Sequence, residues 1–137
     1  MFMIKRANEQ QAFETAITQI IVQGRQSMDT YGTCLYRGPD GTRCGIGALI
    51  TNKEYRKGME CKSVHVLGEQ GLLPLALLDF DMYFLKRIQE LHDFKWELGM
   101  YYFILHVKEA AKDFHLDTKF LEALQPRIRQ LKKAQAQ

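Results

Sequence analysis

The apolar residues in the C-terminal part of this chain recur with the period of an α-helix, and this pattern constrains the fold more than any other feature. After Asp81, whose side chain can cap a helix start, the residues Phe84, Leu85, Ile88 and Leu91 share one helical face. Asp93 is positioned to start a second helix. The inward-facing residues expected there are Phe103, Ile104, Val107, Ala110, Ala111 and Phe114.

A third stripe of this kind follows Asp117. It comprises Phe120, Leu124, Ile128 and Leu131. The stripe stays in phase across Pro126, which predicts a kinked helix rather than a full break. At the other end of the chain, residues 9–23 form an amphipathic pattern that begins after Asn8 and ends at Gly24.

The stretch between these helices is more irregular. Residues 31–36 suit an extended strand, and Gly38-Pro39-Asp40-Gly41 is a strong turn signal because Pro fixes one backbone angle and Gly accepts a positive one. Residues 44–50 fit either a second strand or a short buried helix. Ser63 can cap a short helix, and residues 72–78, which include a proline, fit a buried connection or a short helix.

The composition agrees with one globular domain. The chain has 137 residues, of which 46% are hydrophobic and 26% charged, and it contains no repeat or linker. The predicted fold is mainly α (α+β): a helical bundle of about four to six helices with a small β-hairpin or extended turn near residues 31–50. Residues 1–137 form a single domain that ends in a basic helix, 117–137.

Several features favour a cytoplasmic protein without a membrane partner. No apolar run approaches the ~20 residues that cross a bilayer. The N-terminus lacks the order of a signal peptide, because its charges follow a very short apolar stretch. The three cysteines are odd in number, which fits free thiols in a reducing compartment.

The net charge of +3 lies wholly in residues 117–137, which carry five basic and two acidic side chains. The favoured interpretation of this tail is a solvated helix end whose cations complement the helix dipole. The alternative is a nucleic-acid-binding module, in which Arg37 and Arg43 could assist. The tail candidates for that function are Arg127, Arg129, Lys132 and Lys133.

Cys34 and Cys44 bracket the predicted turn, which would bring their thiols together. With Cys61 and His65 they could supply the four ligands of a structural zinc site. The spacing differs from that of zinc knuckles, however, and free cysteine is commonly buried. We therefore favour two packed thiols, with no metal and no cofactor.

Two regions are candidates for a protein-binding surface. Trp96, Tyr101, Tyr102 and Phe103 lie within eight positions and cannot all face one core stripe, so some of them should lie at or outside the core boundary. The tip of the turn is the second region. The candidate residues are Arg37, Asp40, Arg43, Trp96, Tyr101 and Tyr102. The alternatives are a tyrosine that covers the core edge and a solvated turn with weak ion pairs.

The sequence offers little support for catalysis. His92-Asp93 matches the dyad of metal-dependent phosphohydrolases, but no further ligands follow in a matching order, and Asp93 as a helix cap explains the pair. The glycines at positions 45 and 47 lack the rest of a phosphate-binding loop, and no serine lies in a nucleophile elbow. We expect the protein not to be an enzyme.

The segment Cys34-Leu-Tyr-Arg-Gly-Pro-Asp-Gly-Thr-Arg-Cys44-Gly-Ile-Gly-Ala-Leu-Ile50 resembles a group of small uncharacterised proteins of tailed phages and prophages. Ser63-Val64 and His92-Asp93 follow in the order that this group shows. The resemblance implies no catalytic residues. It implies a phage accessory protein in the cytoplasm of the infected host cell, which acts by binding a host or defence-system protein.

Overall fold

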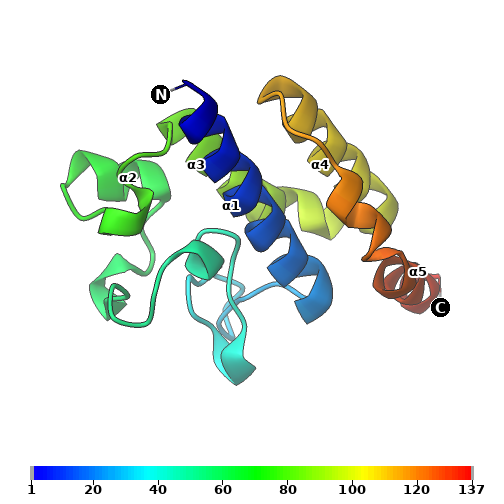
Figure 1. The fold of residues 1–137 in the computed structure, drawn as a ribbon. Coiled ribbons are helices and arrows are strands. Elements are labelled where there is room, and N and C mark those ends of the chain that lie inside the picture. Colours follow the sequence, from blue (N-terminus) through cyan, green and yellow to red (C-terminus); the bar gives the residue numbers. More distant parts are fainter. Residues whose placement is uncertain (1, 137) are drawn as a thin grey trace.

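The computed structural model describes residues 2–136, with the side chains of residues 8–136. Its α-helices are α1 (Phe2–Gln23), α2 (Val64–Glu69), α3 (Met82–Glu90), α4 (Met100–Asp113) and α5 (Gln125–Gln135). In Figure 1, α1 runs through the middle of the molecule, with α2 and the central loops on one side and α4 and α5 on the other. The predicted mainly helical fold is confirmed.

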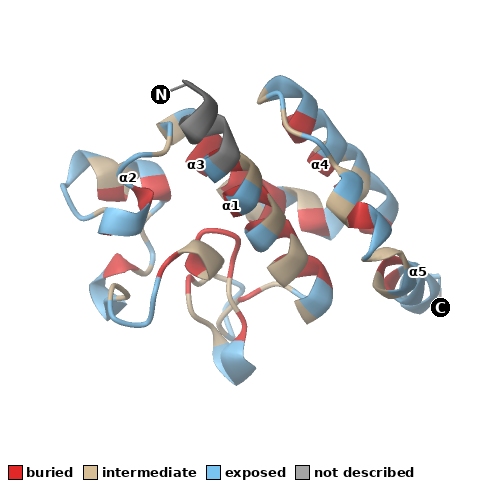
Figure 2. Ribbon diagram, viewed as in Figure 1, coloured by how far each residue is buried: buried red, intermediate tan, exposed pale blue. Residues whose placement is uncertain are grey.

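Helix α1 supplies the centre of the core. Phe13, Ile17, Ile20 and Ile21 are buried along one face, as the sequence predicts, and Figure 2 shows this buried face in red. The helix starts at Phe2, well before the predicted start, so Asn8 is an exposed residue inside the helix and not its cap. It ends where expected, because Gly24 takes a φ of 74° that other residues avoid.

The predicted caps of α2 and α3 are confirmed. The Ser63 hydroxyl accepts a hydrogen bond from the amide of Val66, and the Asp81 carboxylate accepts one from the amide of Tyr83. All four members of the predicted α3 stripe, Phe84, Leu85, Ile88 and Leu91, are buried. These caps depend on local sequence alone, which is why the pattern identifies them.

The prediction that Asp93 starts a helix is wrong. The chain continues from α3 through one π-helical turn (Leu91–Lys95) and one 3-10 turn (Trp96–Leu98), and the next helix, α4, begins after Gly99. Gly99 interrupts the helical backbone with a φ of 95°. The amide of Met100, the first residue of α4, donates a hydrogen bond to the side chain of Gln135 in α5. The predicted inward face of α4 is otherwise correct, with Ile104 and Phe114 half-buried at its edge.

Pro126 starts a helix instead of kinking one. Residues Lys119–Glu122 form a 3-10 turn, and α5 begins at Gln125 with the proline in its first turn, where the missing amide costs nothing. Ile128 and Leu131 are buried on its inner face, while Phe120 lies edge-on to Phe13 of α1 at 5.9 Å between ring centroids. The apolar stripe predicted after Asp117 therefore faces the core as expected, but it is divided between a 3-10 turn and α5.

The central segment contains no strand among the described residues. The predicted hairpin is reduced to two isolated antiparallel bridges, Met28 with Cys34 and Arg37 with Arg43, so the extended-turn alternative holds. Residues 44–50 hold a 3-10 turn, Gly47–Leu49. A Cβ on Gly47 would overlap the carbonyl group of Tyr36, so this close backbone approach requires glycine.

The connection over residues 72–78 is largely exposed, contrary to the buried alternative. It contains a 3-10 turn, Leu75–Leu77, that follows Pro74. Only Pro74 and Leu77 are buried in it, and Leu72, Leu75 and Leu78 face outward. Within residues 2–136, none of the helices combines the length and the apolar character needed to cross a bilayer.

Candidate functional site

Glu60 holds the central segment in place. Its carboxylate accepts hydrogen bonds from the backbone amides of Tyr36 and Arg37 and from the hydroxyl of Tyr55, at 2.9, 3.2 and 2.7 Å. The Tyr36 hydroxyl in turn donates to the carbonyl of Lys62. These bonds attach the turn between Cys34 and Cys44 to the loop that contains Glu60, and they do so without a β-strand.

Arg37, a predicted binding residue, is used within the fold. Its guanidinium donates to the side chain of Asn52 and the carbonyl of Ile50, and it lies over the ring of Tyr55 at 5.6 Å. Its Nε atom is buried and has no hydrogen-bond partner within the described part of the chain. Partial burial lowers the pKa of this guanidinium. Arg37 therefore stabilises the turn and does not present a free charge.

The tip of the turn is solvated. Asp40 forms an ion pair with Arg25 at 3.0 Å, and both side chains are largely exposed. The Arg43 guanidinium lies 3.5 Å from the side chain of Asn52, a weak contact. Exposed pairs of this kind contribute about 0–1 kcal/mol. Asp40 and Arg43 thus lie at the surface. They do not form a common anion-binding site with Arg37.

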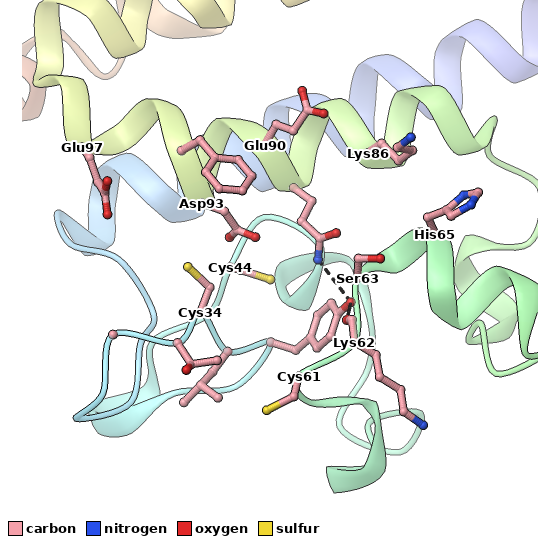
Figure 3. Close-up of a pocket in the computed structure, with 16 residues that line it drawn as sticks. Cys34, Cys44, Cys61, Lys62, Ser63, His65, Lys86, Glu90, Asp93 and Glu97 are labelled. Carbon is pink, nitrogen blue, oxygen red and sulfur yellow. Dashed lines mark hydrogen bonds between the residues drawn. The ribbon is translucent and has the colours of Figure 1, made fainter.

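A cleft of about 540 Å³ lies between the central segment and α3 (Figure 3). One wall is formed by residues 32–36, a second by residues 61–65, and the third by the face of α3 and of the turns that follow it. All three cysteines line it: Cys34, Cys44 and Cys61. In Figure 3, Asp93 and Glu97 lie toward one end, while Lys86 and His65 lie toward the other.

His92 and Asp93 form a hydrogen-bonded chain behind this cleft. The backbone amide of Ser27 donates to Nε2 of His92 at 2.9 Å, so the neutral ring carries its proton on Nδ1. Nδ1 donates to the Asp93 carboxylate at 2.7 Å, and the thiol of Cys34 is hydrogen-bonded to the same carboxylate. His92 is fully buried, as is Ser27. The dyad joins the first loop to the end of α3.

The four residues considered as alternative zinc ligands do not form one cluster. Cys34, Cys44, Cys61 and His65 all line the cleft, but the described residues contain one group of three ligand atoms within 4.8 Å of one another, from Cys34, His92 and Asp93. A metal at this group would need the lone pair of Nδ1, whereas the Ser27 amide already occupies Nε2 and leaves the proton on Nδ1. His65 instead pairs with Glu69 at 2.8 Å. The hydrogen bonds therefore explain the group without a metal.

The thiols are not activated. Burial, followed by the charge of Asp93 and its hydrogen bond, raises the pKa of Cys34 to about 12. Burial also raises the pKa of Cys44 to about 12, and its sulfur accepts a hydrogen bond from the amide of Gly47. Because the thiolate is the reactive form, both residues are poor nucleophiles at neutral pH.

A set of large apolar side chains is exposed between residues 94 and 105, and its first member, Phe94, also lines the cleft. We call this set the aromatic strip: it consists of Phe94, Leu98, Tyr101, Tyr102 and Leu105. Tyr101 and Tyr102, at 61% and 54% exposed, stack edge to face at 5.3 Å. The predicted Trp96 is not part of it, because its ring is only 9% exposed and packs on Phe103 in the core.

The four candidate cations of the basic tail divide into one structural and three solvated side chains. Arg127 donates to the carbonyl of Ile21 and to the side chain of Gln130, which ties α5 to the end of α1. Arg129, Lys132 and Lys133 are exposed and share one face of α5, opposite the buried Ile128 and Leu131. Of the four candidate nucleic-acid-binding residues, Arg127 therefore has a structural role, and the other three are available to a ligand.

Sequence reasoning missed Glu60 and Phe94. Glu60 lies in a polar loop, and nothing in its local pattern indicates that it accepts bonds from residues 24 positions earlier. Phe94 lies in the π-helical turn and is 65% exposed at the edge of the cleft. Comparison of the chain with protein-family models, with curated proteins and with solved structures found no match.

Proposed function

We propose that this chain is a non-enzymatic binding protein that docks a protein partner on the aromatic strip. The observation that carries the proposal is the exposure of two stacked tyrosines between two exposed leucines. Large apolar side chains that lie together in water favour association, because covering them removes apolar surface from water. Scattered surface residues would not have this property.

The residues of the strip suit recognition. Tyrosine offers a large contact area with only two rotatable side-chain bonds, so little conformational entropy is lost on binding, and its hydroxyl can form hydrogen bonds at an interface. Leu105 follows Tyr101 by four residues and Tyr102 by three, so its side chain neighbours both tyrosines on the surface of α4. The rigid helix holds this face in place before the partner arrives.

The absence of catalysis is part of the proposal. Among the described residues, the histidine, cysteine and carboxylate side chains that cluster within 4.8 Å are Cys34, His92 and Asp93, and internal hydrogen bonds and the raised thiol pKa explain this group. The resemblance to small phage proteins suggests the identity of the partner: a host or defence-system protein in the infected cell.

The test is capture of partners from a bacterial lysate with the tagged chain, in the presence of nuclease and at high salt. We expect Tyr101→Ala and Tyr102→Ala together to abolish capture of a partner that the parent chain retains. Tyr83→Ala is the matched control, since Tyr83 is an exposed tyrosine on α3 outside the strip. If all variants capture the partner equally and their melting temperatures are unchanged, the aromatic strip is not the docking surface.

A second candidate function is nucleic-acid binding through α5. Its support is the shared exposed face of Arg129, Lys132 and Lys133, none of which has an ion-pair partner within residues 8–136. Three phosphate contacts would give a slope of about −3 when the logarithm of the binding constant is plotted against that of salt concentration. A mobility-shift assay without retardation of DNA or RNA at low salt rejects this candidate.

A further inference from the structure

The C-terminal turn of α5 lies against the start of α4, where the tyrosines of the aromatic strip begin. The Gln135 side chain of α5 accepts a hydrogen bond from the amide of Met100 at 2.8 Å, and Met100 directly precedes Tyr101 in α4. Figure 1 shows the two helices next to each other on one side of the molecule. The two stacked tyrosines therefore begin one residue after the point where α5 meets α4.

The part of α5 that makes this contact is basic. Lys132 and Lys133 precede Gln135 by three and two residues, so they lie within about one helical turn of the contact with α4, and Arg129 lies one turn earlier. These three cations are exposed and have no ion-pair partner within residues 8–136. No acidic residue follows Glu122 in the sequence. Unpaired positive charge therefore lies beside an exposed apolar surface.

The negative charges nearby do not cancel these cations. The C-terminal dipole of α5 is equivalent to roughly half an elementary negative charge. Residues 94–105 span the aromatic strip, and their two charged side chains, Lys95 and Glu97, are opposite in sign, so the strip adds no net charge. The combined surface of the strip and the end of α5 is therefore net positive. A surface of this sign attracts an acidic partner and disfavours a basic one.

We propose that the partner docks on the aromatic strip with an acidic segment. Its apolar side chains cover Tyr101 and Tyr102, and its flanking aspartate or glutamate side chains pair with Lys132 and Lys133. This inference rests on the proposed function, because it names the chemistry of the partner that the same surface receives. Exposed charge pairs contribute little affinity by themselves, so the apolar contact holds the partner and the charges select it.

The chemistry of the surface favours a protein segment over a nucleic acid. Leu98 and Leu105 accompany the two tyrosines, whose rings pack against each other at 87°. Aliphatic side chains match the apolar side chains of a protein, whereas surfaces that bind single strands combine stacking platforms with a positively charged groove that follows the backbone. Residues 1–116 carry no net charge, so the excess positive charge of the chain is confined to its C-terminal part.

The test uses the full-length chain labelled with ¹⁵N and two capped peptides, Asp-Glu-Phe-Leu-Glu-Asp and Lys-Lys-Phe-Leu-Lys-Lys. We expect the acidic peptide to give saturable chemical-shift changes at the amides of Tyr101, Tyr102 and Lys132, and the basic peptide to give none. The double variant Lys132→Gln, Lys133→Gln should weaken binding of the acidic peptide about fivefold, the size expected for two exposed charge pairs.

The matched control is the double variant Lys53→Gln, Lys57→Gln. It makes the same change in net charge at two exposed lysines of the loop that precedes α2, and it should leave the dissociation constant of the acidic peptide unchanged. Raising the ionic strength should weaken binding to the parent chain more than binding to the variant that lacks Lys132 and Lys133, because salt screens exposed charges.

The inference is overturned if the acidic peptide shifts none of these amides, if the basic peptide shifts them equally, or if the Lys132 and Lys133 variant binds as tightly as the parent. Two further results also overturn it. Stronger binding of an oligothymidine strand at the same amides assigns the surface to nucleic acid. Shifts of these amides on concentrating the chain alone assign the surface to a second copy.

Failure here and failure of the proposed function are distinguishable. If the acidic peptide does not bind while the tyrosine variants still lose the captured partner, the acidic chemistry is wrong and the aromatic strip remains the docking surface. If the acidic peptide binds as expected while the tyrosine variants retain the captured partner, the proposed function fails, and the preference of this surface for acidic segments stands.

Discussion

Replacing His92 by leucine tests whether the buried hydrogen-bonded chain is structural. Leucine fills a similar volume without polar atoms, so the change removes two hydrogen bonds with little loss of packing. The fully buried amide of Ser27 would lose its acceptor, which costs about 1–3 kcal/mol. Asp93 would lose a charge-assisted bond, but it stays partly hydrated, and this limits its share to about 1 kcal/mol.

The expected loss in the free energy of unfolding is therefore about 3 kcal/mol. For a chain of this length the unfolding entropy is roughly 0.3 kcal/mol per kelvin, so the melting temperature should fall by about 10 °C. Urea titration followed by circular dichroism measures the first quantity, and a thermal scan measures the second. A loss of this size is a large part of the 5–15 kcal/mol typical of a domain.

Two further variants separate the two bonds. Glutamine at position 92 can place an acceptor near the position of Nε2 and retain the Ser27 bond, so His92→Gln should cost clearly less than His92→Leu. His65→Leu is the control, because that histidine is exposed and pairs only with Glu69. The reasoning is refuted if His92→Leu costs less than about 1 kcal/mol, or if the glutamine and leucine variants are equally unstable.

Further predictions concern the central segment and the thiols. Gly47→Ala should destabilise the fold by about 3 kcal/mol in urea titration, because the new Cβ overlaps the backbone of Tyr36. Ser63→Ala removes the cap of α2 and should cost about 1 kcal/mol by the same measurement. Asp93→Asn should lower the pKa of Cys34 from about 12, measured as the pH profile of alkylation with iodoacetamide. Since the folded pKa of Cys34 lies above its ordinary value of 9.0, stability should fall as the pH rises from about 9 toward 12, and Cys34→Ala should fall less steeply. An unchanged alkylation profile in the asparagine variant contradicts the assigned role of the carboxylate.

The corrected predictions share a physical cause. Asp93 has the sequence signature of a helix cap, yet its carboxylate is occupied by the neighbouring histidine, and Gly99 sets the real helix boundary. Trp96 belongs to a run of aromatics in which periodicity cannot choose the exposed members. A π-helical turn interrupts the regular period there, and within this stretch Phe94 is exposed and the tryptophan is buried. Such an interruption depends on tertiary packing and leaves no local pattern.

The sequence by itself determined the helical class, the buried face of each helix, the caps at Ser63 and Asp81, and the exposure of at least one tyrosine of α4. These properties follow from periodicity and from hydrogen bonds between residues a few positions apart. Only the tertiary structure decided that Arg37 is used internally, that His92 bonds to Ser27, and that all three cysteines line one cleft. Those arrangements join residues tens of positions apart, and their partners are chosen by how the helices pack.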